Sequence, residues 1–390
     1  MPENIQQSQP MKHTNIYQSI LFFLIASPFL CHAAVTIKVI NPTNIQRQEV
    51  VEIDTLDVFR LLDITSTNNF VIRNAAKTPV AHQITHNGKI LFEVCVQPFR
   101  TALYTISECN KQIQYDTIVC GALYRQRLDD IAWENDLSAY RIYGPALQAT
   151  GEKAFGIDIW TKNVPYPVVA HRYKENKYHK DNGTGLDCYD VGPSLGCGAS
   201  ALMIGDSLVM PYCYQSFKIL DNGPLRFSVE LTYPPFPCKK DKNIVEHRLI
   251  SLDKGSHFNK MTLWYDGLSH ATPLASGIVI HQSDTSNVIL EKDHLLYADP
   301  TDNARKHNCQ IYTAILFPEE NRHTRMLVHP DIKDIAGHAV GIVSYTPGER
   351  KTYYFGSAWS KYDIRTFPAW KLHAKETLYA LRHPLHIIIE

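Results

Sequence analysis

The chain has 390 residues, a formal net charge of zero and a pI near 7.3. This balance argues against a general nucleic-acid-binding protein, which carries a basic surplus or a basic stripe. Hydrophobic residues make up 44% of the chain and charged residues 20%, so a sizeable core can be buried.

The beginning of the chain has the pattern of a secretory signal. Met11-Lys-His is a short basic start, residues 20–30 form an apolar run, and small residues end at Ala34. The run is too short to span a bilayer. We therefore expect residues 1–34 to be removed and the protein to be exported, to the periplasm or the extracellular space, without a membrane span.

Eight cysteines remain after this segment, an even number that permits disulfides in an exported protein without choosing among the pairings. None of them stands in a Cys-x-x-Cys pair, so the sequence predicts no metal site. The cofactor stays open: the sequence requires none, and a divalent cation is compatible with it. The oligomeric state is also open.

The mature chain begins with short strands separated by Asn, Gly and Pro, which is typical of a β-sandwich. Residues 35–40 alternate apolar and polar side chains, and 56–62 read as a helical turn. We interpret residues 35–125 as an N-terminal β region, whose further strands are expected at 50–53, 70–73, 80–84, 89–96 and 101–106.

The rest of the chain, 126–390, is interpreted as the main β-sandwich, continuous with the N-terminal region. Residues 125–136 read as a polar lead-in, 297–302 as a turn, and 367–381 as the only convincing helix. No period recurs that would indicate a propeller or solenoid. The prediction is an all-β protein, a large antiparallel sandwich with few helices, with strands at 139–143, 156–162, 201–204, 207–210, 217–220, 223–233, 244–252, 257–265, 277–282, 310–317, 324–328, 340–345 and 353–361.

Residues 140–200 carry the strongest functional signal. The segment combines charged and aromatic residues with five glycines between 183 and 198, and glycines allow the backbone to approach a ligand closely. Arg141 and Tyr143 share one pleat face, and Asp158, Trp160 and Lys162 alternate likewise. An ordered surface loop beside solvated strands explains the same pattern, and Arg141 could simply pair with Asp158.

Two chemistries fit these residue types, because the motifs of nucleotide binding, zinc proteases and Gly-x-Ser-x-Gly hydrolases are missing. One is glycoside hydrolysis by paired carboxylates, with Asp181, Asp187, Glu230 and Glu246 as candidates. The other is β-elimination beside a carboxylate, which needs a base, a cation and an acid. His179 or Tyr189 can be the base, and Arg141 and Lys162 the cations.

Several blocks resemble a family of secreted proteins encoded in bacterial polysaccharide-utilisation loci, long labelled a domain of unknown function. The blocks extend over the mature chain and include 132–136, 141–147, 156–162, 178–187, 191–198, 222–226, 250–256 and 353–361. The family is similar to oligosaccharide dehydratases of ulvan breakdown. The resemblance implies a supersandwich fold like that of galactose mutarotases, and removal of water or a sugar alkoxide from an acidic oligosaccharide.

The expected function is therefore a lyase or dehydratase acting on uronic-acid or sulfated oligosaccharides. His179, Tyr189 and Arg141 are the predicted catalytic residues. The predicted substrate-binding residues are Tyr143, Trp160, Lys162, Asp181, Asp187, Arg226, Glu246 and His281. His247 stands where the family pattern suggests Lys or Arg before Arg248. A glycoside hydrolase on the same scaffold and a non-catalytic glycan-binding protein remain the alternatives.

Overall fold

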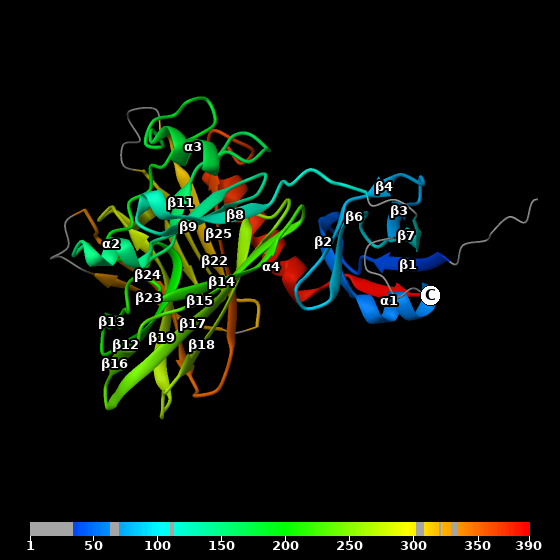
Figure 1. The fold of residues 1–390 in the computed structure, drawn as a ribbon. Coiled ribbons are helices and arrows are strands. Elements are labelled where there is room, and N and C mark those ends of the chain that lie inside the picture. Colours follow the sequence, from blue (N-terminus) through cyan, green and yellow to red (C-terminus); the bar gives the residue numbers. More distant parts are fainter. Residues whose placement is uncertain (1–33, 63–69, 110–112, 302–307, 320, 329–333) are drawn as a thin grey trace, which may run out of the picture. The chain divides into compact units, whose positions relative to one another are not determined.

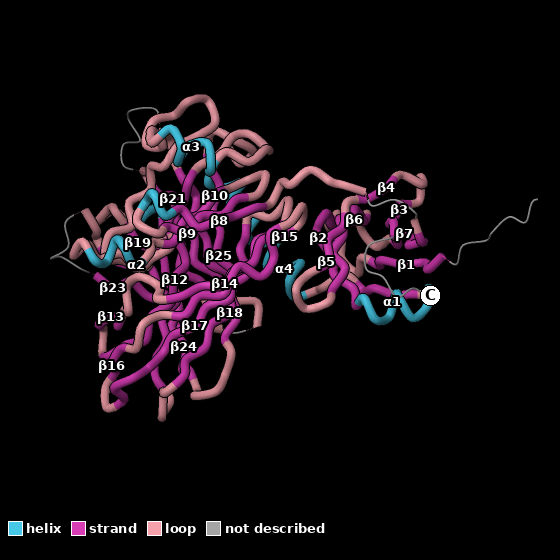
Figure 2. The backbone as a smooth tube through the Cα atoms, in the orientation of Figure 1, coloured by secondary structure: helices cyan, strands magenta, loops and turns pink. Residues whose placement is uncertain are grey.

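The computed structural model describes residues 34–62, 70–109, 113–301, 308–319, 321–328 and 334–390. Of the predicted signal, only Ala34 is among them. Antiparallel strands dominate this part of the chain, with four short or medium α-helices (Figures 1 and 2). The predicted all-β antiparallel sandwich with few helices is confirmed.

The largest sheet has nine strands, in the order β14-β15-β17-β18-β25-β22-β21-β20, with β16 paired to β17. Its inner face carries alternate residues into the main core, as the two-residue period of a strand requires. In β17, Glu246, Arg248 and Ile250 are buried on this face, as their alternation predicts. The strands are β14 Ser216–Asn222, β15 Arg226–Thr232, β16 Phe236–Cys238, β17 Asp241–Asp253, β18 Phe258–Asp266, β20 Val288–Glu291, β21 His294–Asp299, β22 Ile311–Leu316 and β25 Lys351–Trp359.

A five-stranded sheet packs against this inner face, in the order β13-β12-β19-β24-β23. Its strands are β12 Cys197–Ile204, β13 Ser207–Val209, β19 Thr272–Ile280, β23 His323–Val328 and β24 Gly337–Tyr345. The two sheets form the sandwich. The turn expected at 297–302 is wrong in its first part, because β21 continues to Asp299 and pairs with β22 along its whole length.

A four-stranded sheet, β11-β10-β9-β8, contributes to the same core. Its strands are β8 Cys120–Tyr124, β9 Asp130–Glu134, β10 Ala139–Ile142 and β11 Asp158–Trp160. Residues 125–136 are more than a polar lead-in, because all five residues of β9 are buried. Their carboxylates, Asp130 and Glu134, are tolerated inside because each contacts a buried cation.

The N-terminal strands form two further sheets, β26-β1-β7-β3-β4 and β2-β6-β5, which enclose a core of their own with helix α1, Thr55–Leu62. The last strand of the chain belongs here, because β26 pairs with β1 and places Ile389 opposite Ile37. The boundary at residue 125 stays a prediction. The strands are β1 Ala34–Ile40, β2 Arg47–Asp54, β3 Phe70–Asn74, β4 Pro79–Val80, β5 His82–Ile84, β6 Lys89–Val96, β7 Thr101–Glu108 and β26 His386–Ile389.

Helix α4, Phe367–Arg382, covers part of the outer face of the nine-stranded sheet. It begins where the Thr366 hydroxyl caps the Ala369 amide, and Trp370, Ala374 and Leu378 are its buried stripe. Two other helices, α2 Pro145–Ala149 and α3 Val169–Glu175, are too short to show a helical period, which is why the sequence did not reveal them. No helix among the described residues is both long and apolar enough to cross a bilayer.

Trp370 is the main anchor of α4, and its removal tests this packing. The indole is fully buried, stacks 5.3 Å from the Phe258 ring and donates to the Thr313 carbonyl at 3.1 Å. Trp370→Ala should lower the free energy of unfolding by about 3–5 kcal/mol, because it leaves a large cavity. Urea denaturation measures the change. Leu372→Ala, at a side chain that is 58% exposed on the same helix, should change stability by less than about 0.5 kcal/mol.

Candidate functional site

A buried arginine in β10 gathers three aspartates. Arg141 is 4% exposed. Its guanidinium contacts the Asp158 carboxylate on the neighbouring strand, lies 3.0 Å from Asp187 Oδ2 and 3.6 Å from Asp130 Oδ2. We call these four residues the Arg141 cluster. The simple pairing of Arg141 with Asp158, which the sequence left open, is therefore present, but two further carboxylates join it.

The cluster holds three carboxyl groups and one guanidinium, and the pKa values of two of the carboxyl groups are raised. Burial raises the pKa of Asp130 to about 6, against the opposing pull of Arg141 and of the Tyr173 hydroxyl. Burial also raises the pKa of Asp158 well above its usual range. Burial by itself would lower the pKa of Arg141, but the adjacent aspartates raise it, so the guanidinium stays charged.

The loop that follows α3 brings Asp187 to this arginine. Its shape depends on Gly185, whose φ is +105° and where a Cβ would lie 2.2 Å from the Thr161 carbonyl oxygen. The Asp181 carboxylate accepts hydrogen bonds from the amides of Gly183 and Gly185, and Arg172 donates to the Thr184 carbonyl at 2.6 Å. Asp181 thus shapes the loop, and its other oxygen lies 3.6 Å from Lys361 Nζ.

His179 lies at the outer end of the same loop. Its side chain is 66% exposed, and its Nδ1 lies 3.6 Å from Asp187 Oδ2 and 3.3 Å from the Asp187 carbonyl oxygen. The ring also packs on Tyr178, with centroids 4.6 Å apart. Asp187 therefore contacts buried Arg141 on one side and an accessible imidazole on the other. The 3.6 Å between His179 Nδ1 and Asp187 Oδ2 is an ion-pair distance and is longer than a hydrogen bond.

Two more polar side chains contact residues that adjoin this pair, Tyr143 through Arg141 and Arg127 through Tyr178. Tyr143 is partly buried, with its hydroxyl 3.4 Å from Arg141 Nη2. Arg127 is also partly buried and lies 5.8 Å over the ring of Tyr178. The sequence did not single out Arg127. The backbone of the two residues after Arg127 is strained. Leu128 and Asp129 both have positive φ, which is uncommon for residues other than glycine.

Trp160 and Lys162 lie near the cluster but inside the protein. The Trp160 indole is 1% exposed and stacks on Tyr178 at 4.8 Å. Lys162 is fully buried and lies 2.7 Å from a Glu134 carboxylate oxygen, and that carboxylate also accepts from the first amides of α3. Both residues support the loop that carries His179 and present no open surface of their own.

Tyr189 and His281 meet in a neighbouring part of the core. Tyr189 is 4% exposed, its ring lies edge-on to His281 at 5.6 Å, and burial raises its pKa well above the usual range. His281 contacts Asp299 at 2.6 Å and the Asp190 carbonyl oxygen at 2.8 Å. Burial opposes its charged form, but Asp299 outweighs this and raises the pKa. A phenol buried in this way does not act as an accessible base.

The remaining predicted residues lie on the nine-stranded sheet, away from the Arg141 cluster. Glu246 is buried in the main core, 2.5 Å from Arg248 Nε, and Glu230 is partly exposed on β15. Arg226 points to the outer face, where it forms two hydrogen bonds with Asp253 and one with Glu52. Among the described residues, no group of three or more His, Cys, Asp or Glu is arranged to hold a metal ion.

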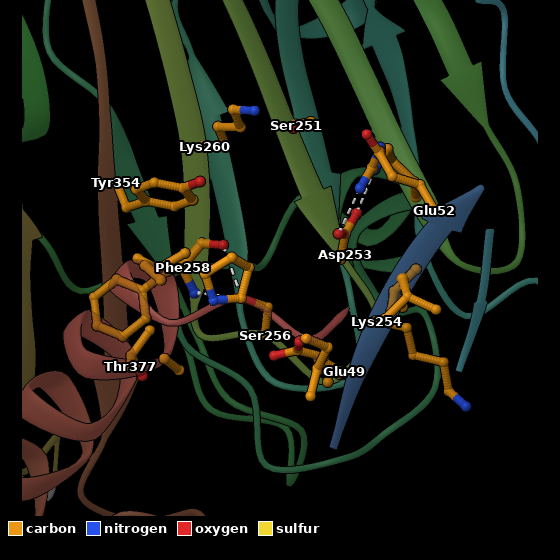
Figure 3. A pocket seen from close by; sticks show the side chains of 18 of the residues that line it. Glu49, Glu52, Ser251, Asp253, Lys254, Ser256, Phe258, Lys260, Tyr354 and Thr377 are labelled. Carbon is orange, nitrogen blue, oxygen red and sulfur yellow. Dashed lines mark hydrogen bonds and ion pairs between the residues drawn. The ribbon is translucent and has the colours of Figure 1, made fainter. Parts of the chain in front are cut away.

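Arg226 belongs to a cleft of about 730 Å³, which Figure 3 shows from close by. The cleft is lined by β2, by the outer face of β15, β17, β18 and β25, and by α4. The sequence did not predict it, because its residues come from segments that are far apart along the chain.

Two solved structures share the fold. One is described as an alpha-mannosidase from Enterococcus faecalis V583, with a TM-score of 0.51, 9% identity and coverage of 92% of this chain and 46% of that chain. The other, a protein in the glycosyl hydrolase family 38 from Enterococcus faecalis, has a TM-score of 0.51, 9% identity and coverage of 93% and 48%. The chain spans about half the length of these structures, and the likeness concerns the fold.

The sequence comparisons point to one family. The uncharacterized protein P7 of Formosa agariphila is 27% identical over 321 residues, which cover 77% of this chain and 78% of that protein. Residues 39–387 match the family described as Domain of unknown function (DUF4861), and this match includes the Arg141 cluster, His179 and the cleft. The protein belongs to the DUF4861 family.

Proposed function

We propose that the protein is an exported carbohydrate-active enzyme that cleaves or dehydrates an acidic oligosaccharide by β-elimination. The observation that carries the proposal is the pairing of exposed His179 with Asp187, whose carboxylate is fixed from behind by buried Arg141. The fold shared with the structures described as an alpha-mannosidase and a glycosyl hydrolase family 38 protein supports a carbohydrate substrate.

In the proposed step, His179 removes the proton from the carbon next to the substrate carboxylate. The electron pair of that C–H bond forms a carbon–carbon double bond as the bond to the oxygen on the next carbon breaks. Asp187 stabilises the imidazolium that forms on His179, and this imidazolium then gives the proton to the leaving oxygen, so the histidine ends the step in its starting form. Water or a sugar alcohol departs, according to what that oxygen carries.

The substrate carboxylate needs a cation, because its charge must be neutralised before the adjacent carbon can lose a proton. Arg141 has three aspartates around it, and Lys162 is fully buried against Glu134. We propose Arg127 for this role, because it is partly exposed and lies over Tyr178, the ring on which His179 packs. Arg141 then acts as a positioning residue that holds Asp187.

A glycoside hydrolase is the second candidate. The glycosidase structures of the same fold favour it, and so does Asp130, a carboxyl group that keeps its proton up to about pH 6. Such an enzyme needs one protonated and one ionised carboxyl group on either side of the scissile bond. Asp130, Asp158 and Asp187 are all buried around Arg141, which makes elimination through exposed His179 the better fit.

Removing the imidazole tests the base directly. His179→Ala should lower kcat by about 100-fold or more, the usual contribution of a general base, in assays with oligosaccharides that carry a terminal uronic acid. The melting temperature should stay within a few degrees, because the side chain is largely exposed. His171→Ala is the matched control, since His171 on α3 is 71% exposed and contacts only Glu175 among the described side chains. Equal activity of both variants would contradict the role of His179.

The mass of the products separates elimination from hydrolysis. Chain cleavage by elimination should give products whose combined mass equals that of the substrate, and dehydration a product lighter by one water. In both cases a double bond conjugated to the carboxylate should absorb in the ultraviolet. Mass spectrometry and absorbance measure both properties. Products that together gain one water and show no new absorbance would identify a hydrolase instead.

The raised pKa of Asp130 predicts how stability changes with pH. The folded protein holds a proton on Asp130 up to about pH 6, whereas the unfolded chain releases it near pH 4. This group's stabilising contribution is therefore complete below pH 4 and is lost as pH rises to about 6, by roughly 3 kcal/mol at most. The unfolding free energy of the wild type, minus that of Asp130→Asn, should fall over this range in urea titrations. A difference that rises with pH would contradict the shift.

A further inference from the structure

The floor of the cleft consists of alternate residues from neighbouring strands of the nine-stranded sheet. Ser251 and Asp253 of β17, Lys260 of β18 and Tyr354 of β25 lie on the outer face, while the residues between them enter the main core. Lys260 and Tyr354 are directly opposite each other in the β18–β25 ladder. Figure 3 shows these side chains around one hollow, with Glu49 and Glu52 of β2 along its other wall.

Several charged groups of the cleft are already paired with one another. Arg226 binds Asp253 at 2.6 and 2.8 Å and Glu52 at 2.9 Å, and Arg47 binds Glu49 at 2.8 Å. Groups held in this way keep spare lone pairs and N–H bonds, so they can hydrogen-bond a ligand without first losing conformational freedom. They form a rigid polar wall.

The balance of charge in the cleft selects against an anion. Carboxylates slightly outnumber cations in the lining: Glu49, Glu52, Asp221, Asp253 and Glu376 against Arg47, Arg226, Lys254 and Lys260. Three of these cations are also bound to carboxylates. His373 adds no positive charge near neutral pH, because burial lowers its pKa to about 4. An acidic ligand would meet a surface that is neutral to negative.

We propose that this cleft is a second carbohydrate site, separate from the His179 site, and that it binds a neutral oligosaccharide. Its volume of about 730 Å³ is within the range of small-molecule sites. Sugar hydroxyls can donate to the paired carboxylates and accept from Lys260, and the partly exposed ring of Tyr354 offers an apolar face to a sugar ring. The inference rests on the proposed function only in that both sites take carbohydrate.

Calorimetric titration of the full chain with neutral gluco-, manno- and xylo-oligosaccharides of about two to four residues tests the site. At least one of these probes should bind the wild type, and Tyr354→Ala should weaken that binding by about ten-fold, because the loss of a stacking ring is of the order of 1 kcal/mol. Lys260→Ala is a second variant that leaves the Tyr354 ring in place and should also weaken binding. Tyr166→Ala, at a tyrosine that is 53% exposed and outside the cleft lining, is the matched control.

Two results would overturn the inference. One is the absence of binding by every neutral probe, or binding that neither Tyr354→Ala nor Lys260→Ala weakens. The other is an oligogalacturonate that binds more tightly than the neutral probes and depends on Tyr354. His179→Ala separates the two proposals, because it should abolish turnover of acidic substrates and leave binding of the neutral probe unchanged. Loss of neutral binding in this variant would place the ligand at the His179 site.

Discussion

The candidate site depends on the ion pairs that the buried Arg141 guanidinium forms with three aspartates. A charge inside a protein is costly unless it is paired, and breaking such a pair typically destabilises a protein by about 3–5 kcal/mol. Here the partners come from three separate segments, Asp130 of β9, Asp158 of β11 and Asp187 of the loop after α3. The need to neutralise Arg141 therefore fixes that loop against the four-stranded sheet.

This constraint explains how an exposed histidine can be held in place. A side chain on a surface loop is normally mobile, and a base must be positioned to be effective. The loop gains rigidity from beneath, because Gly185 packs on the Thr161 backbone and Arg172 binds Thr184. His179 can remain open to a substrate because these contacts and Asp187 hold its loop in place.

Alternation along the chain was enough to predict many of the strands and the shared face of Glu246 and Arg248, because a strand's period is local, but it missed β9 and β21. It could not tell whether a polar face looks into a cleft or into the core. Trp160 and Lys162 alternate as a binding face would, yet both are buried, Trp160 beneath α3 and its loop and Lys162 against Glu134. Asp130 and Glu134 give β9 the sequence of a polar, exposed segment. The cations that neutralise these two carboxylates inside the protein, Arg141 and Lys162, lie elsewhere in the sequence, so the burial of β9 could not be predicted locally.

The ion pairs of the two proposed sites differ in burial and in what they do. Around Arg141 the charges are buried and serve as a scaffold, and the proposed chemistry is assigned to the exposed His179 and the partly exposed Arg127. In the cleft, ion pairs such as Arg226 with Asp253 remain partly exposed, and such pairs add little to stability. Their spare hydrogen-bonding capacity is directed at the hollow instead. A wall of this kind suits a ligand that offers many hydroxyls and no charge, which describes a neutral sugar better than an acidic one.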